Sequence, residues 1–424
     1  MHTPGLPGHG PILGAAGKTP IAPCQAAALL RQALAPRRWP LPAHAFPAGT
    51  ALVGGAVRDG LLGRLGERPD LDLVVPGDAI ELCRRLSQRY GGSCVVLDQE
   101  RSMARLVLQG WSLDLARCVG GDPIIDLGRR DYTINAMALP LQDGAALLDP
   151  HGGLADLAAG RLAAISEANL LDDPLRLLRG LRLAAELRFT IEPRSWQWIR
   201  QHHQTLGQVA PERVLAEVEK LAAAADGARG LALALESGLL TPWSRAPIGA
   251  LEQLGASAGA HCGLNAAELE WALPLARLAA LFGAADLARL RSSKRLQQRC
   301  QSLRRWRQQL AGADPERLPE LEQLRLHREL EADLPALVLL LPLPAEQACR
   351  WLSRWRTGND LLFHPRPPLD GRALQQQLGL APSPQLGELI AHLTLEQAFG
   401  RLASETEALE AARHWLAEHR DDPP

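Results

Sequence analysis

The stretch of sequence that decides the fold is residues 54–75, "GGAVRDGLLGRLGERPDLDLVV". It begins with the pair Gly54 and Gly55 and ends in an apolar run, typical of a strand, that holds Asp70 and Asp72. Because side chains alternate along a strand, the two carboxylates share one face and lie about 7 Å apart. Carboxylates held that close repel each other unless a cation lies between them. Acidic pairs also occur on exposed strand edges, but this pair, set in an apolar run, indicates a metal site.

The composition is that of a soluble globular protein with several domains. The chain has 424 residues, of which 46% are hydrophobic and 22% are charged, and its formal net charge is -1. Its length is enough for about two to four domains, and it has no run of about 18 apolar residues, so we expect no membrane span. The first residues lack the basic start and apolar core of a signal peptide, and the seven cysteines form no CxxC pair. We therefore expect reduced thiols in the cytoplasm and no zinc ribbon.

The chain changes character near Gly153. Before this residue, short apolar runs typical of strands alternate with helix-like segments; after it, strand signals largely vanish and Leu, Ala and Arg recur at helical spacing. We predict an α+β fold, in which an N-terminal head with a mixed β-sheet and helices is followed by an elongated all-α part. The expected segments are a Pro/Gly/Ala-rich leader and helix (1–48), the head (49–153), a helical neck (154–225), a helical body (226–355) and a helical tail (356–424).

Gly54 and Gly55 follow a predicted strand, where glycines let the backbone approach a phosphate closely. A helix that begins just after them directs its N–H groups at the same anion. Taken alone, the two glycines are more simply interpreted as a plain turn. Followed by the two aspartates, however, "GGAVRDGLLG" and "DLDLVV" resemble the signature of the polymerase-β-like nucleotidyltransferases. More closely, they resemble the bacterial class II family of tRNA CCA-adding enzymes and poly(A) polymerases.

That resemblance implies roles for the residues of this motif. Asp70 and Asp72 would be the catalytic carboxylates and would hold two Mg²⁺ ions. The triphosphate would be cradled by the turn and the helix after it, through Gly54, Gly55 and Arg58. Arg58 also has a simpler interpretation, since it could pair with Asp59 across the turn. Further along, "WSLDLA" places Asp114 on a candidate strand, and this superfamily often has a third metal carboxylate on such a strand.

The segment "RRDYTINAMA" (129–138) resembles the second motif of the same family. The resemblance implies that Arg130 meets phosphate, while Asp131 and Asn135 hold the sugar hydroxyls and favour a ribonucleotide. From the residues alone, Asp131 and Arg129 could instead cap and solvate a turn.

The segment "LLDDPLRLLRGLRLAAEL" (170–187) resembles the fourth motif. Asp173 and Arg176 are three residues apart on a predicted helix and therefore share a face. A carboxylate accepts and a guanidinium donates, so the pair can imitate the hydrogen-bonding edge of a base. The resemblance implies that the pair selects C and A without a nucleic-acid template, and it adds Arg179 to the nucleotide-binding residues. Asp173 also suits the N-cap of this helix, with Pro174 as the first helical residue.

Three other segments resemble less specific parts of the family. "LDPHGGLADL" (148–157) is similar to the third motif, a flexible connection in which Asp149 and Gly153 fit the usual acid and glycine. "APERVLAEVEKLAAA" (210–224) is similar to a helix that braces the neck, and we expect its acids and bases to pair with neighbours. Residues 367–416 are similar to a C-terminal segment of the family.

A basic segment lies where the resemblance is faint. No acid occurs between Asp286 and Asp314, while eight Lys or Arg residues and Trp306 do. Such a stretch suits the phosphate backbone of RNA, and tRNA is recognised more through shape and phosphates than through bases. The alternative is a solvated basic face that pairs with acids elsewhere. The candidate RNA-binding residues are Arg291, Lys294, Arg295, Arg299, Arg304 and Arg305.

The resemblance as a whole implies nucleotidyl transfer to tRNA. The tRNA 3′-hydroxyl would attack the α-phosphorus of CTP or ATP and pyrophosphate would leave, which builds the terminal CCA without a template. The expected partners are the tRNA 3′ end, CTP and ATP, with no membrane and no DNA. The alternatives are relatives that add only CC, only A or a poly(A) tail. A non-catalytic RNA-binding module predicts a damaged pair of aspartates, whereas the pair is intact.

Overall fold

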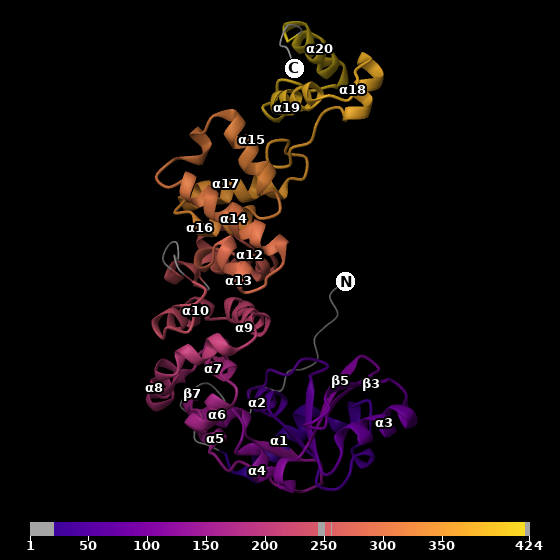
Figure 1. Cartoon of the computed structure of the whole chain (residues 1–424), viewed down its shortest axis with the longest axis vertical. Helices are drawn as coiled ribbons and strands as arrows, with labels where there is room; N and C mark the ends of the chain where they lie inside the picture. Colours follow the sequence, from indigo (N-terminus) through magenta and orange to yellow (C-terminus); the bar gives the residue numbers. More distant parts are fainter. Residues whose placement is uncertain (1–20, 245–250, 256, 420–424) are drawn as a thin grey trace. The chain divides into compact units, whose positions relative to one another are not determined.

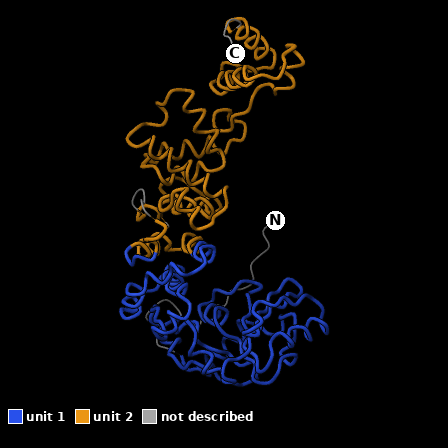
Figure 2. The backbone as a smooth tube through the Cα atoms, in the orientation of Figure 1, with its two compact units in different colours: residues 1–217, 236–239 blue, residues 218–235, 240–424 orange. Residues whose placement is uncertain are grey.

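The computed structural model describes residues 21–244, 251–255 and 257–419. The chain divides into two compact units, coloured separately in Figure 2: residues 1–217 with 236–239, and residues 218–235 with 240–424. The first unit holds a mixed sheet with helices, and the described residues of the second unit form helices and turns without a strand. The predicted α+β fold is confirmed. The division into five segments stays a prediction, and residues 1–20 of the leader lie outside the described residues.

A six-stranded mixed sheet forms the core of the first unit (Figure 1). Its strands lie in the order β3-β4-β5-β2-β1-β6; β2 and β5 run parallel, whereas the other neighbouring pairs run antiparallel. The strands are β1 (Ala51–Val53), β2 (Leu71–Val75), β3 (Ser93–Asp98), β4 (Met103–Leu108), β5 (Trp111–Arg117) and β6 (Ala138–Pro140).

The sequence of β2 explains its central place. Leu71, Leu73, Val74 and Val75 are buried, as is expected of a strand that is covered on both faces. Asp72 is half-buried among them, between β1 on one side and β5 on the other. The sheet therefore carries a carboxylate within the apolar run of a central strand.

Helices pack around this sheet. The carboxylate of Asp78 accepts hydrogen bonds from two backbone N–H groups, which starts helix α3, and α3 packs against β4 and β5. A two-residue parallel pair, β7 (Arg161–Leu162) with β8 (Thr190–Ile191), interrupts the part predicted to be all helical. The helices are α1 (Pro23–Leu34), α2 (Gly55–Leu61), α3 (Ala79–Tyr90), α4 (Pro123–Leu127), α5 (Gly153–Ala159), α6 (Glu167–Asp172), α7 (Leu175–Leu187), α8 (Pro193–Gln201) and α9 (Pro211–Ala223), with 3-10 turns η1 (Pro36–Arg38), η2 (Ala43–Ala45), η3 (Val119–Gly121), η4 (Thr133–Asn135) and η5 (His203–Gln208).

The second unit begins within α9 and continues through helices drawn from magenta to yellow in Figure 1. Its last three helices have an apolar core of their own, which includes Leu374, Leu389, Leu393 and Trp415. The helices are α10 (Gly227–Glu236), α11 (Ala258–Cys262), α12 (Ala266–Leu281), α13 (Ala284–Arg289), α14 (Lys294–Gln309), α15 (Glu320–Glu329), α16 (Leu334–Leu340), α17 (Ala345–Arg356), α18 (Gly371–Leu378), α19 (Pro384–Ala398) and α20 (Glu405–Glu418), with 3-10 turns η6 (Leu251–Leu254) and η7 (Pro315–Arg317).

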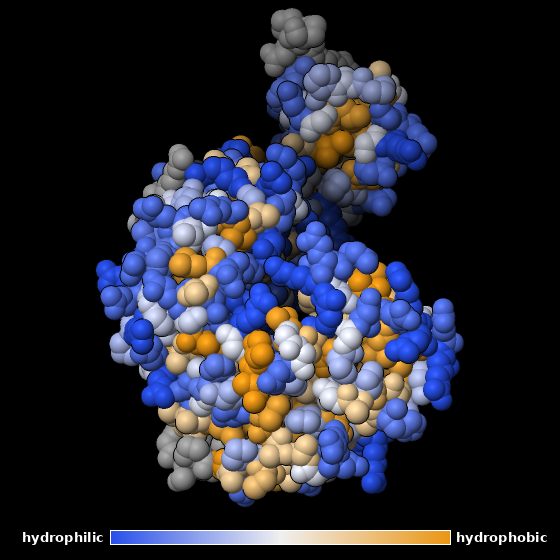
Figure 3. All heavy atoms as spheres, turned by 60° about the horizontal axis from the view of Figure 1, so that its bottom comes forward, coloured by the Kyte–Doolittle hydropathy of each residue, from blue (hydrophilic) through white to orange (hydrophobic). Residues whose placement is uncertain are grey.

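On the face shown in Figure 3, hydrophilic side chains are interspersed with apolar patches, of which an extended one lies toward the bottom of the view. In the first unit, large exposed apolar side chains form two groups, one on the edge strand β3 and its neighbour and one on and just before α4, and Leu171 on α6 is exposed as well. Among the described residues, no helix is long and apolar enough to cross a membrane. The exposed apolar residues of these two groups are Val95, Val96, Leu97 and Val107, and Val119, Ile124 and Ile125.

Gly180 in α7 is required by its contact with Tyr132. The Tyr132 ring is fully buried, and its hydroxyl donates to the Arg176 carbonyl oxygen at 2.9 Å. A Cβ on Gly180 would overlap that hydroxyl and lie 2.6 Å from the Cζ atom of the ring. We predict that Gly180→Ala lowers the free energy of unfolding by about 1–3 kcal/mol, because the buried ring has no space to move into. Denaturant unfolding of the purified protein measures the change.

Gly207→Ala is the matched control, because a Cβ on Gly207 would meet nothing within 4 Å and the residue lies in the same unit. We expect its free energy of unfolding to stay close to that of the wild type. Equal losses in the two variants would show that the contact with Tyr132 is not what requires a glycine in α7.

Candidate active site

The turn between β1 and α2 brings the backbone against a carboxylate. Gly54 has φ 74° and ψ -137°, a conformation that only glycine adopts readily, and α2 begins at the next residue. A Cβ on Gly54 would lie 3.1 Å from Asp72 Oδ2 and 3.4 Å from Arg130 Nη1. A glycine is therefore needed here for two reasons: its backbone dihedral angles, and the close approach of the Asp72 and Arg130 side chains to its Cα. The motif at residues 54–75 and the motif at residues 129–138 therefore meet at this turn.

Asp70 and Asp72 differ in their surroundings. Asp70 lies just before β2 and is exposed, whereas Asp72 is half-buried and stands beside Asp114 across the parallel β2–β5 pair. Burial raises the pKa of Asp72, and the charges of Asp114 and Asp70 raise it further, while the guanidinium groups of Arg130 and Arg179 act in the opposite direction. The folded chain therefore disfavours a bare negative charge on Asp72.

These carboxylates fit a divalent metal that also binds substrate. No group of three or more His, Cys, Asp or Glu side chains in the described part of the chain is arranged to enclose a metal ion. Mg²⁺ is usually held by one or two carboxylates together with substrate phosphates and water, rather than by a complete protein cage. The crowded negative charge at Asp72, beside the Gly54 turn, suits such a partial set of ligands, and the roles of Asp70 and Asp72 as catalytic metal ligands stay predictions.

Asp114 already has a partner. Arg105 on β4 donates from Nε and Nη2 to the two carboxylate oxygens of Asp114, at 2.7 and 2.8 Å. The two residues are opposite each other in the antiparallel β4–β5 pair, so the contact follows from the register. A role of Asp114 as a metal ligand stays a prediction, and it would require at least one oxygen to leave Arg105.

Arg58 lies at the start of a chain of side-chain contacts. It is 8% exposed and donates to both carboxylate oxygens of Asp59 at 2.9 Å, which is the pairing that its sequence neighbour suggested. It also donates to Asn135 Oδ1 at 2.7 Å. Asn135 in turn donates from Nδ2 to Asp131 Oδ1 at 3.1 Å.

Asp131 continues this chain of contacts to α7. Its Oδ2 forms an ion pair with Arg179 Nε at 2.8 Å, and its Oδ1 also accepts from the Tyr132 N–H at 2.8 Å. Burial acts to raise the pKa of Asp131, but Arg179 and the hydrogen bonds outweigh it and hold the pKa below its usual value. The structure thus brings together Arg58, Asn135, Asp131 and Arg179; their contacts with a nucleotide stay predictions.

Arg130 has donors to spare. Its Nη2 donates to Asp126 Oδ2 at 3.2 Å, and its Nε is buried without a hydrogen-bond partner. A buried donor left unpaired costs about 1–3 kcal/mol, so it calls for an acceptor. The guanidinium lies next to the Gly54 turn and Asp72, and its contact with a phosphate, which the resemblance implies, stays a prediction.

Asp173 and Arg176 are both engaged within the protein. Asp173 Oδ1 accepts from the Leu175 N–H at 3.3 Å, and Oδ2 accepts from Arg213 Nη2 at 2.8 Å. Arg176 donates from Nη1 to the carbonyl oxygens of Arg129 and Asn169, at 3.0 and 2.7 Å. Helix α7 begins at Leu175, one residue later than predicted, and its N-cap is Pro174 and not Asp173, although Asp173 accepts from the first helical N–H. Selection of a base by this pair stays a prediction.

The connecting segments make structural contacts. Asp149 accepts from the N–H groups of Gly153 and Leu154, at 2.6 and 3.0 Å, and so begins α5. On α9, Arg213 pairs with Asp173, and Glu217 accepts from Arg182 Nε at 2.6 Å. These are the bracing contacts that the sequence indicated for residues 210–224.

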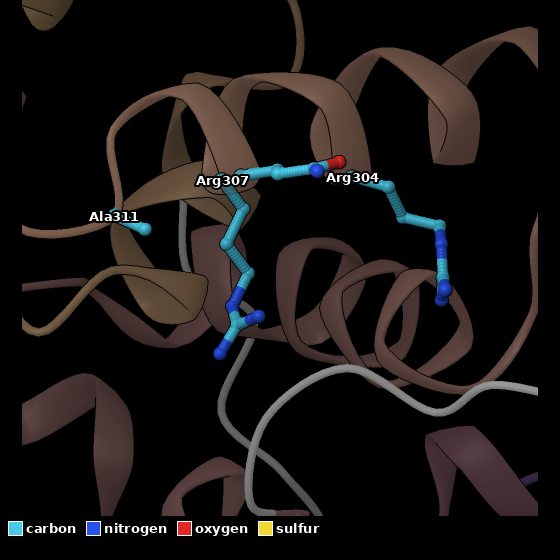
Figure 4. A pocket seen from close by; sticks show the side chains of 4 residues that line it. Arg304, Arg307 and Ala311 are labelled. Carbon is cyan, nitrogen blue, oxygen red and sulfur yellow. The ribbon is translucent and has the colours of Figure 1, made fainter.

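The basic segment forms α14, and several of its arginines hold neighbouring parts of the second unit. Arg299 pairs with Asp333 at 2.7 Å and Arg305 pairs with Glu329. Arg304 donates to the Ala279 carbonyl at 2.9 Å, and together with Arg307 it lines a pocket on one side of α14 (Figure 4). The alternative of pairing with acids elsewhere therefore holds for Arg299 and Arg305. RNA binding stays a prediction for all six candidates. Among them, the side chains of Arg291, Lys294 and Arg295 are exposed.

Sequence reasoning missed Arg105, Asp126 and Asn169. Asn169 donates from Nδ2 to the carbonyl oxygens of Gly128 and Arg130, which lie about forty residues earlier in the chain. A single asparagine in an apolar helical segment gives no local signal of such a contact. The alternating pattern of β4 and β5 could have suggested the pair of Arg105 and Asp114, had their register been known.

Comparison with known proteins agrees with this site. A family model described as "Poly A polymerase head domain" matches residues 119–163, and one described as "Probable RNA and SrmB- binding site of polymerase A" matches residues 188–244. A CC-adding tRNA nucleotidyltransferase of Synechocystis is 35% identical over 87% of this chain and 94% of its own length. The chain belongs to the tRNA nucleotidyltransferase family. Nucleotidyltransferases generally use divalent metal ions, which the carboxylates described above fit.

Other members of the tRNA nucleotidyltransferase family align to different extents. A CC-adding enzyme of Geobacter sulfurreducens is 34% identical over 85% of this chain and 90% of its own length. An A-adding enzyme of Deinococcus radiodurans is 42% identical over 48% of this chain and 46% of its own length. The solved structure of the Thermotoga maritima CCA-adding enzyme complexed with tRNA has a TM-score of 0.66 and 22% identity, over 87% of this chain and 91% of that one. That likeness shows a shared fold.

We predict that Asp72→Asn stabilises this nucleotidyltransferase in the absence of divalent metal while it abolishes nucleotidyl transfer. Folding raises the pKa of Asp72 above its usual 3.8, so the ionised side chain destabilises the fold as pH rises through and beyond that value. Asparagine removes the charge and keeps the shape. At pH 7.5 with EDTA we expect a Tm about 2–4 °C higher than the wild type, which for a unit of this size corresponds to about 1 kcal/mol.

Asp70→Asn is the control, because Asp70 is exposed and its loss should change the Tm little. Divalent metal should raise the Tm of the wild type and leave that of Asp72→Asn unchanged. A lower Tm for Asp72→Asn in EDTA would contradict the electrostatic account of this strand.

Proposed function

We propose that this chain takes part in building the CCA end of tRNA by adding its two cytidines from CTP. The observation that carries the proposal is the extent of the alignments. Three relatives that align over 85–88% of the chain are CC-adding enzymes, whereas three A-adding relatives align over 35–48% and a further CC-adding relative over 46%. The sequence left open whether this chain adds the whole CCA or a part of it, and the alignments favour the first two additions.

The reaction is transfer of a cytidylyl group. The 3′-hydroxyl oxygen of tRNA forms a bond to the α-phosphorus of CTP, and the bond from that phosphorus to the bridging oxygen of pyrophosphate breaks. Two Mg²⁺ ions, held by Asp70 and Asp72 with the phosphates, would lower the pKa of the attacking hydroxyl and stabilise charge on the leaving group. The chain's own residues bind the nucleotide and hold its phosphates next to these carboxylates.

The arginines of the site suit different parts of the nucleotide. Arg130, with its unpaired buried Nε beside the Gly54 turn, suits a phosphate. Arg176 uses only Nη1 in its contacts with described residues, so its Nε and Nη2 donors can face the acceptor edge of cytosine. Asp173 can accept from the exocyclic amine of the same base, since Arg213 holds its carboxylate in place.

The remaining parts of the proposal concern RNA and location. The exposed positions Lys294 and Arg295 near the start of α14 are the strongest candidates for contact with the tRNA backbone, because the other arginines of the helix have internal partners. All seven cysteines are free thiols, which supports work in the reducing cytoplasm.

The proposal predicts how far each tRNA transcript is extended. Transcripts that end at the discriminator base, at C and at CC are incubated with purified protein, Mg²⁺, and CTP, ATP or both, and the products are sized to one nucleotide. We expect the first transcript to gain two residues, the second one, and the third none, with or without ATP. Asp72→Asn protein, which lacks the buried carboxylate, should extend none.

Three other outcomes would redirect or reject the proposal. Three residues added to the shortest transcript in the presence of both nucleotides would show a complete CCA-adding enzyme. A single A on the CC-ended transcript alone, or a long A tail, would show the other branches of the family. No extension by the wild type, with an active relative as positive control, would reject the catalytic reading.

A further inference from the structure

Asn169 is buried against the loop that carries Arg130. It is 8% exposed and lies in α6, where the Ser166 hydroxyl accepts from its backbone N–H at 3.1 Å and fixes the start of the helix. Its side-chain Nδ2 donates to the Gly128 oxygen at 2.8 Å and to the Arg130 oxygen at 2.7 Å. An amide NH₂ has two hydrogens, so this single group supplies both bonds.

Arg176 holds the carbonyl between those two. Its Nη1 donates to the Arg129 oxygen at 3.0 Å and to the main-chain oxygen of Asn169 itself at 2.7 Å. Three successive carbonyl groups of the loop are therefore each held by one of two side chains. We call Asn169 and Arg176 the loop clamp. The clamp connects α6 and α7 with the second motif.

The position of Arg130 depends on its backbone more than on its own side-chain bonds. The structure gives its guanidinium one ion pair, to Asp126, and leaves Nε buried without a partner. Its Nη1 nevertheless lies close to the Gly54 turn, and its charge acts on Asp72. A side chain with so few bonds of its own stays in place only if the peptide groups beside it are fixed.

We propose that Asn169 is a positioning residue for the incoming nucleotide: by holding the carbonyls of Gly128 and Arg130, it keeps the Arg130 guanidinium beside Asp72, where the phosphates of CTP bind. This inference rests on the proposed function, because contact between Arg130 and phosphate is part of that function. It adds a residue from outside the motifs, and it makes the phosphate end of the site depend on the same helix pair that carries Asp173 and Arg176.

The chemistry of the contact separates this role from simple packing. Aspartate has nearly the shape of asparagine but, when ionised, offers only acceptors, so Asn169→Asp would set a carboxylate against two carbonyl oxygens. Asn169→Ala removes the donors and part of the volume. A packing role predicts that the aspartate variant behaves better than the alanine variant, whereas a clamp predicts that it behaves worse.

The experiment uses the full chain and measures CTP and tRNA separately. Initial rates of CMP addition to a transcript that ends at the discriminator base are recorded with CTP varied and then with tRNA varied, and CTP binding is measured by titration calorimetry. We expect the KM for CTP and the Kd for CTP to rise roughly tenfold in Asn169→Ala, the factor that loss of about one net hydrogen bond produces, and further in Asn169→Asp. The KM for tRNA should change less than about twofold.

Asn265→Ala is the matched control. Asn265 caps α12 in the second unit by accepting from the Glu268 N–H, so its loss should lower the Tm without changing the KM for CTP. A wild-type KM and Kd for CTP in Asn169→Asp would overturn the proposal. So would a parallel rise of the KM values for CTP and tRNA, because that pattern marks general loss of the fold.

Two further readouts keep the test decisive. If neither variant folds, Asn169→Ser takes their place. Its hydroxyl has one hydrogen on a shorter side chain and can supply at most one of the two bonds, so the proposal predicts weaker CTP binding. Unchanged CTP affinity in that protein overturns the proposal as well. If the wild type binds CTP but extends no transcript, the proposed function fails while the calorimetric comparison still decides the role of Asn169. If the wild type does not bind CTP, both fail.

Discussion

The constraint on which the structure depends is a carboxylate placed inside the apolar middle of a sheet. Asp72 interrupts a strand whose other residues are buried, and burial together with the charges of Asp70 and Asp114 makes its ionised form unfavourable. The fold offsets this with positive charge brought from elsewhere, namely Arg130 from the loop before η4 and Arg179 from α7. A site that stabilises a negative charge incompletely in this way would gain from a bound cation, so the electrostatic cost of the fold agrees with the metal binding that the proposed function requires.

Arginines of the site also connect the elements of the first unit. Arg58 joins α2 to Asn135, Arg179 joins α7 to Asp131, and Arg176 joins α7 to the loop before η4. The buried contact of Arg58 with Asn135 is of the kind worth about 1.5–3 kcal/mol, whereas the contacts of Arg179 and Arg176 are partly exposed and worth less. The head sheet and the helices that follow it in the first unit are therefore held to one another by the same residues that resemble nucleotide-binding positions.

The sequence was sufficient for the local features and not for the pairings. The Gly54 turn, the strand with Asp72 and the helix after Asp173 follow from short-range patterns, and the structure contains all three. The bidentate contact of Arg105 with Asp114 could not be foreseen, because it depends on the register of two strands. For Arg299 and Arg305 the sequence left pairing with acids elsewhere open as an alternative, but it could not identify the partners Asp333 and Glu329, which come from later helices. A charge pattern shows which groups need partners, and only the fold shows which partners they find.

A count of donors refines the roles that the family resemblance implies. A guanidinium has five N–H groups. Arg58 uses Nε, Nη1 and Nη2 for Asp59 and Asn135, and both oxygens of Asp131 are taken, so these two residues form a framework more than a binding surface. Arg130 and Arg176 keep more of their capacity. Because the loop clamp fixes both of them through neighbouring carbonyl groups, phosphate and base would meet donors that are already in position, and binding would not have to order them first.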